Sequence, residues 1–175
     1  STSARNVPPR RMRPARWRRR LPSCANKTVI CAPLDPDSAE ARILMTELDA
    51  ALAAICGDSG AGSFDPADVR GPRSVFLVAR ADGVALGCGA LRPLAPGVAE
   101  LKRMYARPAS GAGRFLLAAL EEQAVAFGYR AVWLSTRRVN ERALAFYARH
   151  GYLPVANYGK YASRAASVCL GKRFS

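Results

Sequence analysis

A glycine turn between a strand-like run and an apolar-periodic helix is the part of this sequence with the clearest chemistry. It lies within Val98–Glu121, where Gly111 and Gly113 precede leucines at helical spacing. The first N–H groups of a helix have no partner inside it, and the helix dipole places positive charge there. Glycines let an anion approach the main chain closely. The pattern therefore favours a phosphate-binding turn, although an ordinary turn is the competing interpretation.

A second informative block is VWLSTRRVNERALAFYARHGYLPV. It predicts a buried strand over Ala131–Ser135, a helix over about Asn140–Arg149, and another strand after Gly151. Together with the glycine turn, this block resembles the acyl-coenzyme A core of the GNAT superfamily of N-acetyltransferases. Six residues fit its N-x-x-A-x-x-F-Y-x-x-x-G-Y pattern position by position: Asn140, Ala143, Phe146, Tyr147, Gly151 and Tyr152. The resemblance runs from about residue 28 to residue 174.

The resemblance implies an α/β (α+β) fold, with a mixed, mostly antiparallel central sheet flanked by helices on both faces. It also implies acetyl-coenzyme A as co-substrate, direct transfer of the acetyl group to a primary amine, and no metal. Cofactor binding would involve main-chain groups of one strand and one loop, with Arg107 or Arg114 supplying charge. These groups are Met104, Tyr105 and Ala106 for the pantetheine and thioester oxygens, and Gly111, Ala112, Gly113 and Arg114 for the pyrophosphate.

The same resemblance assigns side-chain roles. Glu100, on the strand before the turn, would be the general base for the acceptor amine, directly or through water. Tyr147 would be the general acid for the departing sulfur and would line the cofactor site, and Asn140 would bind the pantetheine arm. Two alternatives remain open: Glu100 as an ordinary ion-pair partner of Lys102 or Arg103, and Tyr147 as a core residue.

The pyrophosphate loop departs from the superfamily pattern. Loops of this kind usually read R/Q-x-x-G-x-G/A, but matching Gly111 and Gly113 to the small residues places Pro108 where Arg or Gln is expected. The loop is about three residues shorter than the commonest form, and proline has no amide to donate. A catalytically silent domain that no longer binds coenzyme A is therefore an alternative.

The C-terminal segment VANYGKYASRAASVCLGKRF resembles that of small bacterial GNAT proteins thought to act on amino acids or similar amines. By this resemblance Tyr158, Lys160 and Tyr161 would line an acceptor pocket. The alternative is a surface turn at Tyr158 followed by an edge strand over Ser167–Leu170.

The remaining pattern predicts the elements that position these residues. Apolar residues at helical spacing predict a helix that ends at Gly57, and Asp82-Gly83 predicts a hairpin. The loop Ser59–Asp68 is a candidate substrate lid by the resemblance, or an ordinary connection. The expected strands are Lys27–Pro33, Ser74–Arg80, Val84–Arg92 and Val98–Ala106, and a further helix should run from the glycine turn to Gly128.

Length and composition fit one globular domain. The chain has 175 residues, of which half are hydrophobic, and we expect a single domain over residues 27–175. No apolar run approaches the roughly 18 residues that span a bilayer, so no membrane contact is expected. Five cysteines without a C-x-x-C pair and one histidine favour scattered thiols in a reducing cytoplasm and no metal site.

Residues 1–26 form a basic arm with eight arginines between positions 5 and 20 and no acidic residue. Its prolines oppose a continuous helix. We expect a disordered extension; nonspecific contact with nucleic acid or an acidic partner is the alternative.

The sequence thus predicts a cytoplasmic acetyltransferase acting on a small-molecule primary amine, with amino acids among the candidates. The competing hypotheses are a silent GNAT-fold binding module that uses the arginine arm, and a protein or peptide N-acetyltransferase. Superfamily members often dimerise, so a homodimer is an open expectation.

Overall fold

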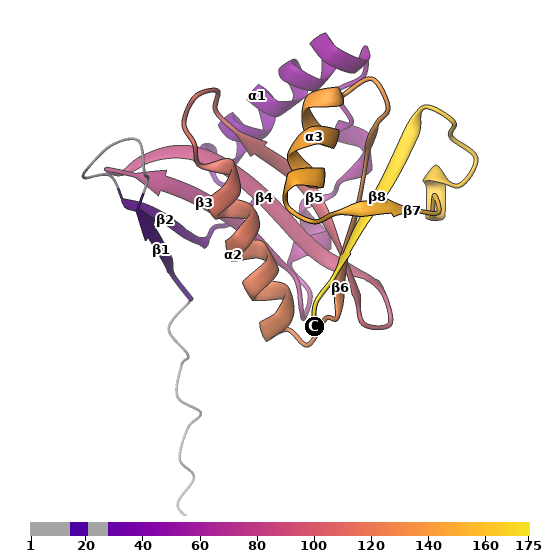
Figure 1. Ribbon diagram of the computed structural model, residues 1–175. Coiled ribbons are helices and arrows are strands. Elements are labelled where there is room, and N and C mark those ends of the chain that lie inside the picture. Colours follow the sequence, from indigo (N-terminus) through magenta and orange to yellow (C-terminus); the bar gives the residue numbers. More distant parts are fainter. Residues whose placement is uncertain (1–14, 21–27) are drawn as a thin grey trace, which may run out of the picture.

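The computed structural model describes residues 15–20 and 28–175, which form one eight-stranded sheet with helices packed on it (Figure 1). The strand order is β1-β2-β3-β4-β5-β6-β8-β7. All neighbouring strands are antiparallel except β5 and β6, which are parallel. The strands are β1 (Trp17–Arg20), β2 (Thr28–Pro33), β3 (Val75–Ala81), β4 (Val84–Ala95), β5 (Val98–Ala106), β6 (Ala131–Arg137), β7 (Leu153–Val155) and β8 (Ser167–Arg173). The predicted mixed, mostly antiparallel sheet is confirmed.

Helices cover both faces of this sheet, as predicted. They are α1 (Ala39–Cys56) on one face and α2 (Gly113–Ala126) and α3 (Glu141–Arg149) on the other. Side chains of a strand alternate between its faces. In β3, Leu77 and Ala79 accordingly pack with α2, whereas Phe76 and Val78 pack with α1. In the described part of the chain, no helix combines the length and apolarity needed to cross a bilayer.

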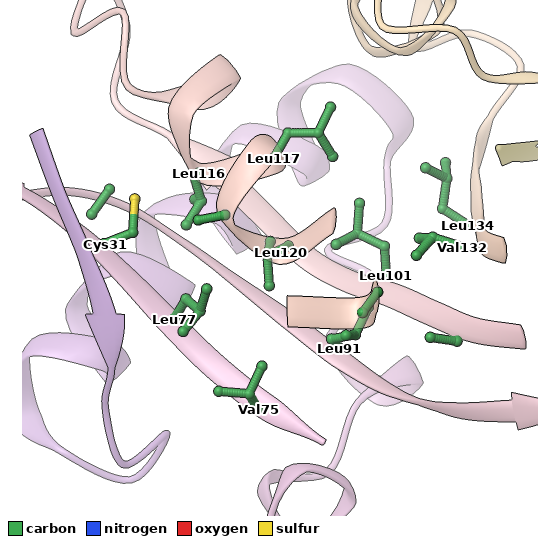
Figure 2. Packing of buried hydrophobic residues seen from close by; sticks show 14 of the residues in the cluster. Cys31, Val75, Leu77, Leu91, Leu101, Leu116, Leu117, Leu120, Val132 and Leu134 are labelled. Carbon is green, nitrogen blue, oxygen red and sulfur yellow. The ribbon is translucent and has the colours of Figure 1, made fainter. Parts of the chain in front are cut away.

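The larger core lies under α2. Leu116, Leu117 and Leu120 of this helix lie over apolar side chains of the sheet, including Leu77 and Leu101 (Figure 2). These leucines recur at helical spacing, so they share one face and are buried together. The core anchors α2, and with it the loop that precedes this helix.

The predicted hairpin joins β3 to β4. Asp82 and Gly83 both have positive φ, at 51° and 77°, which is the backbone of a type I′ turn and explains why Asp-Gly occurs here. β4 continues to Ala95, beyond the predicted end at Arg92, and turns at Gly97 into β5.

The basic arm is ordered where a disordered extension was expected, over Trp17–Arg20. These residues form β1 and pair with β2, because Trp17 opposite Cys31 packs against the main core. Arg19 also forms a 2.7 Å ion pair with Glu122 of α2. The rest of the expected arm, apart from residues 15 and 16, lies outside the described residues.

The alternative that Ser167–Leu170 is an edge strand is wrong. This segment belongs to β8, which lies between β6 and β7. The edge position falls to the short strand Leu153–Val155, and β8 therefore brings the C-terminal segment into the middle of this half of the sheet.

Candidate active site

The two parallel strands in the middle of the sheet separate partway along their length. β5 and β6 pair only from Val98 to Glu100 on one side and from Ala131 to Trp133 on the other. Beyond these residues a cavity of about 450 Å³ opens between the strands. Its wall comes from α1 and the following loop (Leu48, Leu52, Cys56, Asp58, Gly60, Gly62, Ser63), β5 (Leu101–Met104), β6 (Leu134–Arg137), α3 and its cap (Asn140, Ala143, Tyr147), the connection between β7 and β8 (Lys160, Tyr161, Arg164), and the first residue of β8 (Ser167).

A bulge in β5 marks the point where the strand bends. Cys88 pairs with Tyr105 and Ala90 with Lys102, so two β5 residues lie opposite Gly89 of β4. Arg103 adopts a positive φ of 52° in this bulge. A bulge interrupts pairing and turns the strand. Gly89 leaves room for α2, because a Cβ added there would lie 2.7 Å from Leu120 Cδ1 and this side chain would have to move.

The glycine turn before α2 presents main-chain donors. No described residue accepts a hydrogen bond from the N–H of Gly111, Gly113 or Arg114. Positive φ values at Ala109 (58°) and Gly111 (68°) shape the turn. These donors lie at the positive end of the helix dipole, so the turn is chemically suited to an anion.

One predicted donor in this turn is already engaged. The Ala112 N–H donates to Ser110 Oγ at 3.3 Å, and the Ala112 side chain is buried. Arg114 is exposed, with its guanidinium 4.6 Å from the Phe115 ring centre. The shortened loop thus keeps three of the four predicted groups free despite Pro108.

The three β5 residues predicted to contact the cofactor through their main chain have different surroundings. Met104 lines the cavity, whereas the Tyr105 hydroxyl donates to Glu47 Oε2 of α1 at 3.1 Å. Ala106 lies beside the glycine turn, because a Cβ built on Gly113 would be 3.5 Å from the Ala106 Cβ. β5 therefore runs from the cavity to the anion-binding turn.

Arg107 is not available as a phosphate ligand. Its guanidinium forms two hydrogen bonds with the Glu47 carboxylate, at 2.7 and 3.0 Å, and a third with the Ala85 carbonyl at 2.9 Å. This arginine fixes the end of β5 to α1, so of the two arginines predicted to supply charge to the pyrophosphate only Arg114 is free to do so.

Tyr147 and Asn140 both line the cavity from α3, as their spacing predicted. Tyr147 is 7% exposed, and its hydroxyl has no hydrogen-bond partner among the described residues. Burial raises the pKa of Tyr147 above its ordinary value of 10, so the phenol stays protonated. Asn140 caps α3 by accepting from the Ala143 N–H at 3.2 Å. This leaves the side-chain NH₂ of Asn140 as a donor.

Glu100 does not line the cavity. Its side chain is buried, and its oxygens accept from Arg92 Nε at 2.9 Å and from the Tyr158 hydroxyl at 3.0 Å. Lys102 Nζ lies 3.7 Å from Glu100 Oε1. The expected direct contact between Glu100 and an acceptor amine is therefore not what the structure offers, because these partners enclose the carboxylate.

Lys102 lines the cavity instead, whereas its position in the sequence indicated only an ion pair with Glu100. Its Nζ donates to the Tyr161 hydroxyl at 2.7 Å, and its side chain is 7% exposed. Burial lowers the pKa of Lys102 below the usual 10.5, while the Glu100 charge acts in the opposite direction. Lys102 is thus a buried amine in the cavity wall that gives up its proton more readily than a lysine in water.

The two tyrosines predicted for the acceptor pocket lie edge to face, with ring centres 5.6 Å apart. Tyr161 lines the cavity, whereas Tyr158 lies behind it against Trp133 and Glu100. Burial raises the pKa of both phenols, with the Glu100 charge adding to the effect.

Part of the candidate lid Ser59–Asp68 forms the cavity wall, at Gly60, Gly62 and Ser63. Asp68 at its end forms an ion pair with Arg92, which in turn binds Glu100, so the loop is connected to the buried carboxylate.

Burial raises the pKa of Cys56, so this thiol is a poor nucleophile. Within the described residues, no group of three or more His, Cys, Asp or Glu side chains could hold a metal ion.

Comparison with known proteins identifies relatives of this chain. Residues 42–152 match the model of the Acetyltransferase (GNAT) family. A protein named IAA acetyltransferase, from Azospirillum brasilense, is 31% identical over 133 residues, which cover 74% of this chain and 87% of that protein.

Solved structures show the same fold. A Klebsiella pneumoniae protein assigned as an acyl-CoA N-acyltransferase is 28% identical, with a TM-score of 0.68 over 82% of this chain and 95% of that one. PaiA N-acetyltransferase from Thermoplasma acidophilum, solved in complex with coenzyme A, is 25% identical, with a TM-score of 0.50 over 58% and 61% of the two chains.

Proposed function

This chain belongs to the GNAT family of acetyltransferases, and from that premise we propose that it transfers the acetyl group of acetyl-coenzyme A to a primary amine of a small molecule. Amino acids are among the candidate acceptors. The observation that carries the proposal is the cavity between β5 and β6. Its wall includes the Tyr147 phenol, for which the described residues offer no hydrogen-bond partner, and the anion-binding turn lies at the far end of β5.

The residues present fit the co-substrate. The free N–H groups of Gly111, Gly113 and Arg114 would hold the pyrophosphate, and the Ala112 amide would add to them only by leaving Ser110. The Asn140 NH₂ would bind the pantetheine arm. The main chain of β5 at Met104, Tyr105 and Ala106 would bind the pantetheine and polarise the thioester carbonyl, because β6 no longer pairs with this stretch.

Lys102 is the proton acceptor in this proposal. In its neutral form the lysine takes the proton of the acceptor ammonium and becomes an ammonium itself. Glu100 acts through Lys102. Its carboxylate, 3.7 Å from Lys102 Nζ, stabilises the charged form of the lysine and does not have to touch the acceptor amine itself. Lys102 then returns the proton to solvent.

Tyr147 acts on the leaving group. The neutral amine attacks the thioester carbonyl carbon and forms the new carbon–nitrogen bond. When the carbon–sulfur bond breaks, the electron pair stays on sulfur, and the phenol donates a hydrogen bond and then its proton to the thiolate. The acylated nitrogen releases its second proton, and the phenolate takes up a proton from solvent. The raised pKa of Tyr147 makes complete transfer less favourable than for a phenol in water. Burial also raises the pKa of a thiol in the same site, so the difference in pKa between the phenol and the thiol changes less than the raised pKa of the phenol alone would indicate.

Titration of the protein with acetyl-coenzyme A by calorimetry tests the proposal, with Gly111→Asp and Gly111→Asn as a matched pair. Both side chains tolerate positive φ better than most, but only aspartate brings a negative charge. We expect micromolar binding by the wild type, lost in Gly111→Asp and largely kept in Gly111→Asn. A folded wild-type protein that does not bind acetyl-coenzyme A would favour the silent binding module instead.

A further inference from the structure

The charges around the cavity are strongly unbalanced. Its wall contains five basic side chains and one carboxylate, Asp58; the basic residues are Lys102, Arg103, Arg137, Lys160 and Arg164. Such a wall creates a positive potential inside a space that is partly shielded from water, where charges interact more strongly than in bulk solvent.

Three of the five cations already have anionic partners. Arg103 Nη2 lies 2.5 Å from Asp49 Oδ1, and Arg137 Nη2 lies 2.5 Å from Asp58 Oδ2. Lys102 Nζ lies 3.7 Å from Glu100 Oε1. Lys160 and Arg164 differ, because no carboxylate of the described chain lies within ion-pair distance of either. The Asp58 pKa is lowered mainly by hydrogen bonds from the Gly60 N–H and the Arg137 guanidinium, with a smaller contribution from the Arg164 charge, and Arg137 holds that carboxylate.

The main chain fixes Arg164 in place. Its N–H donates to the Tyr161 carbonyl at 2.9 Å, and its own carbonyl accepts from the Ser167 N–H at 2.9 Å and from Asn157 Nδ2 at 3.3 Å. Lys160 lies on the short helical turn Gly159–Tyr161, directly before the tyrosine of the cavity wall. The main chain of this segment is thus hydrogen-bonded, while the Lys160 and Arg164 side chains are exposed and line the cavity.

We propose that the acceptor amine also carries a carboxylate, and that Arg164 and Lys160 bind this carboxylate and select such acceptors. The inference rests on the acetyltransferase function proposed above. An arginine can bind a carboxylate through two parallel hydrogen bonds, which fixes orientation as well as charge. Polycationic acceptors are disfavoured because they would add positive charge to a wall that already has an excess.

The size and the remaining wall of the cavity support a small acceptor of the amino-acid type. About 450 Å³ must accommodate both the thioester end and the acceptor. Leu48 and Leu52 of α1 give the wall an apolar side, which suits a hydrocarbon part of the acceptor. The basic wall also favours the neutral, reactive form of the bound amine over its ammonium form.

The experiment compares acids with their own amides. Thiol release from acetyl-coenzyme A is measured with the twenty amino acids, with the primary amide of each, and with spermidine and an aminoglycoside as polycations. Each series is run with the wild type, with Arg164→Gln, with Lys160→Gln, and with the control Arg149→Gln. Arg149 is an exposed arginine at the end of α3 that does not line the cavity. Calorimetry with acetyl-coenzyme A accompanies every variant.

We expect kcat/KM for the preferred acid to exceed that of its amide by tenfold or more, the size of a lost charge-assisted hydrogen bond. Arg164→Gln should remove most of this preference through KM, without a change in acetyl-coenzyme A affinity, and Arg149→Gln should keep it. If amides or polycations react as well as the acids, the carboxylate proposal is overturned, but the acetyltransferase function stands. The carboxylate proposal is also overturned if the protein binds acetyl-coenzyme A but acetylates none of the acids. Loss of acetyl-coenzyme A binding in the wild type would overturn the proposed function itself.

Discussion

Replacement of Lys102 gives the sharpest test of the proposed proton transfer. In Lys102→Met an unbranched side chain of similar length fills the same space without a titratable group. In Lys102→Arg a positive charge beside Glu100 and a donor for Tyr161 remain, but a guanidinium cannot release its proton at working pH. Both variants therefore remove the base, and only one of them removes the charge.

The structural cost of Lys102→Met should be small. At 3.7 Å the attraction between Lys102 and Glu100 amounts to about 4.5 kcal/mol for an effective dielectric constant of 20, but burying the ammonium costs a similar amount. Glu100 also keeps Arg92 and the Tyr158 hydroxyl. We expect the free energy of unfolding to change by about 1 kcal/mol or less, which corresponds to roughly 2–4 °C in Tm.

The catalytic cost should be large for both variants. Loss of a general base lowers kcat by about 10²- to 10⁴-fold, or roughly 3–5 kcal/mol in activation free energy. Because burial lowers the pKa of Lys102, the wild-type rate should rise with pH and level off at a lower pH than for a lysine in water. This rise should be absent in both variants.

Steady-state kinetics from pH 6 to 10 with the preferred amine, together with thermal unfolding, measures all of these effects. If Lys102→Arg keeps wild-type turnover and the same pH profile, Lys102 acts only through its charge and the proposed base is wrong. If Lys102→Met unfolds the protein, the arginine variant still decides the question.

Two further substitutions test the neighbouring roles. Tyr147→Phe should lower kcat by at least tenfold with little change in acetyl-coenzyme A affinity, because its hydroxyl loses no hydrogen bond to any residue that the structure describes; unchanged turnover would remove its role as the acid. Glu100→Gln should destabilise the fold by about 2–4 kcal/mol, since Arg92 and Lys102 lose a buried anion, and thermal unfolding would measure this. It should also shift the rise of rate to lower pH, because the Glu100 charge raises the Lys102 pKa; a stable variant with an unmoved profile would contradict the assigned link.

Local patterns in the sequence were sufficient to predict most elements of the fold. The Asp82-Gly83 turn, the glycines before α2 and the Asn140 cap each impose a backbone shape on their own neighbours. Asn140 and Tyr147 share a helix face because they are seven residues apart, so their joint presence in the cavity was also predictable.

Features that depend on distant partners were not predictable in the same way. Glu100 is enclosed by Tyr158, 58 positions away, and Arg107 is held by Glu47, 60 positions away. Such pairs appear only once the strand order is known. β1 was missed for a related reason: three consecutive arginines give no strand pattern, and the segment is ordered by Trp17 packing on a core built from the rest of the chain.

The acceptor-binding and cofactor-binding groups lie on different parts of the chain, which affects how this enzyme can diversify. The cations that we assign to acceptor choice lie on the connection between β7 and β8, outside every strand pairing of the sheet. The groups assigned to coenzyme A lie on β5, on α3 and at the start of α2, which the main core supports. Mutations that retune the acceptor can therefore accumulate with little loss of stability, and gene duplicates could diverge in substrate while retaining the same donor chemistry.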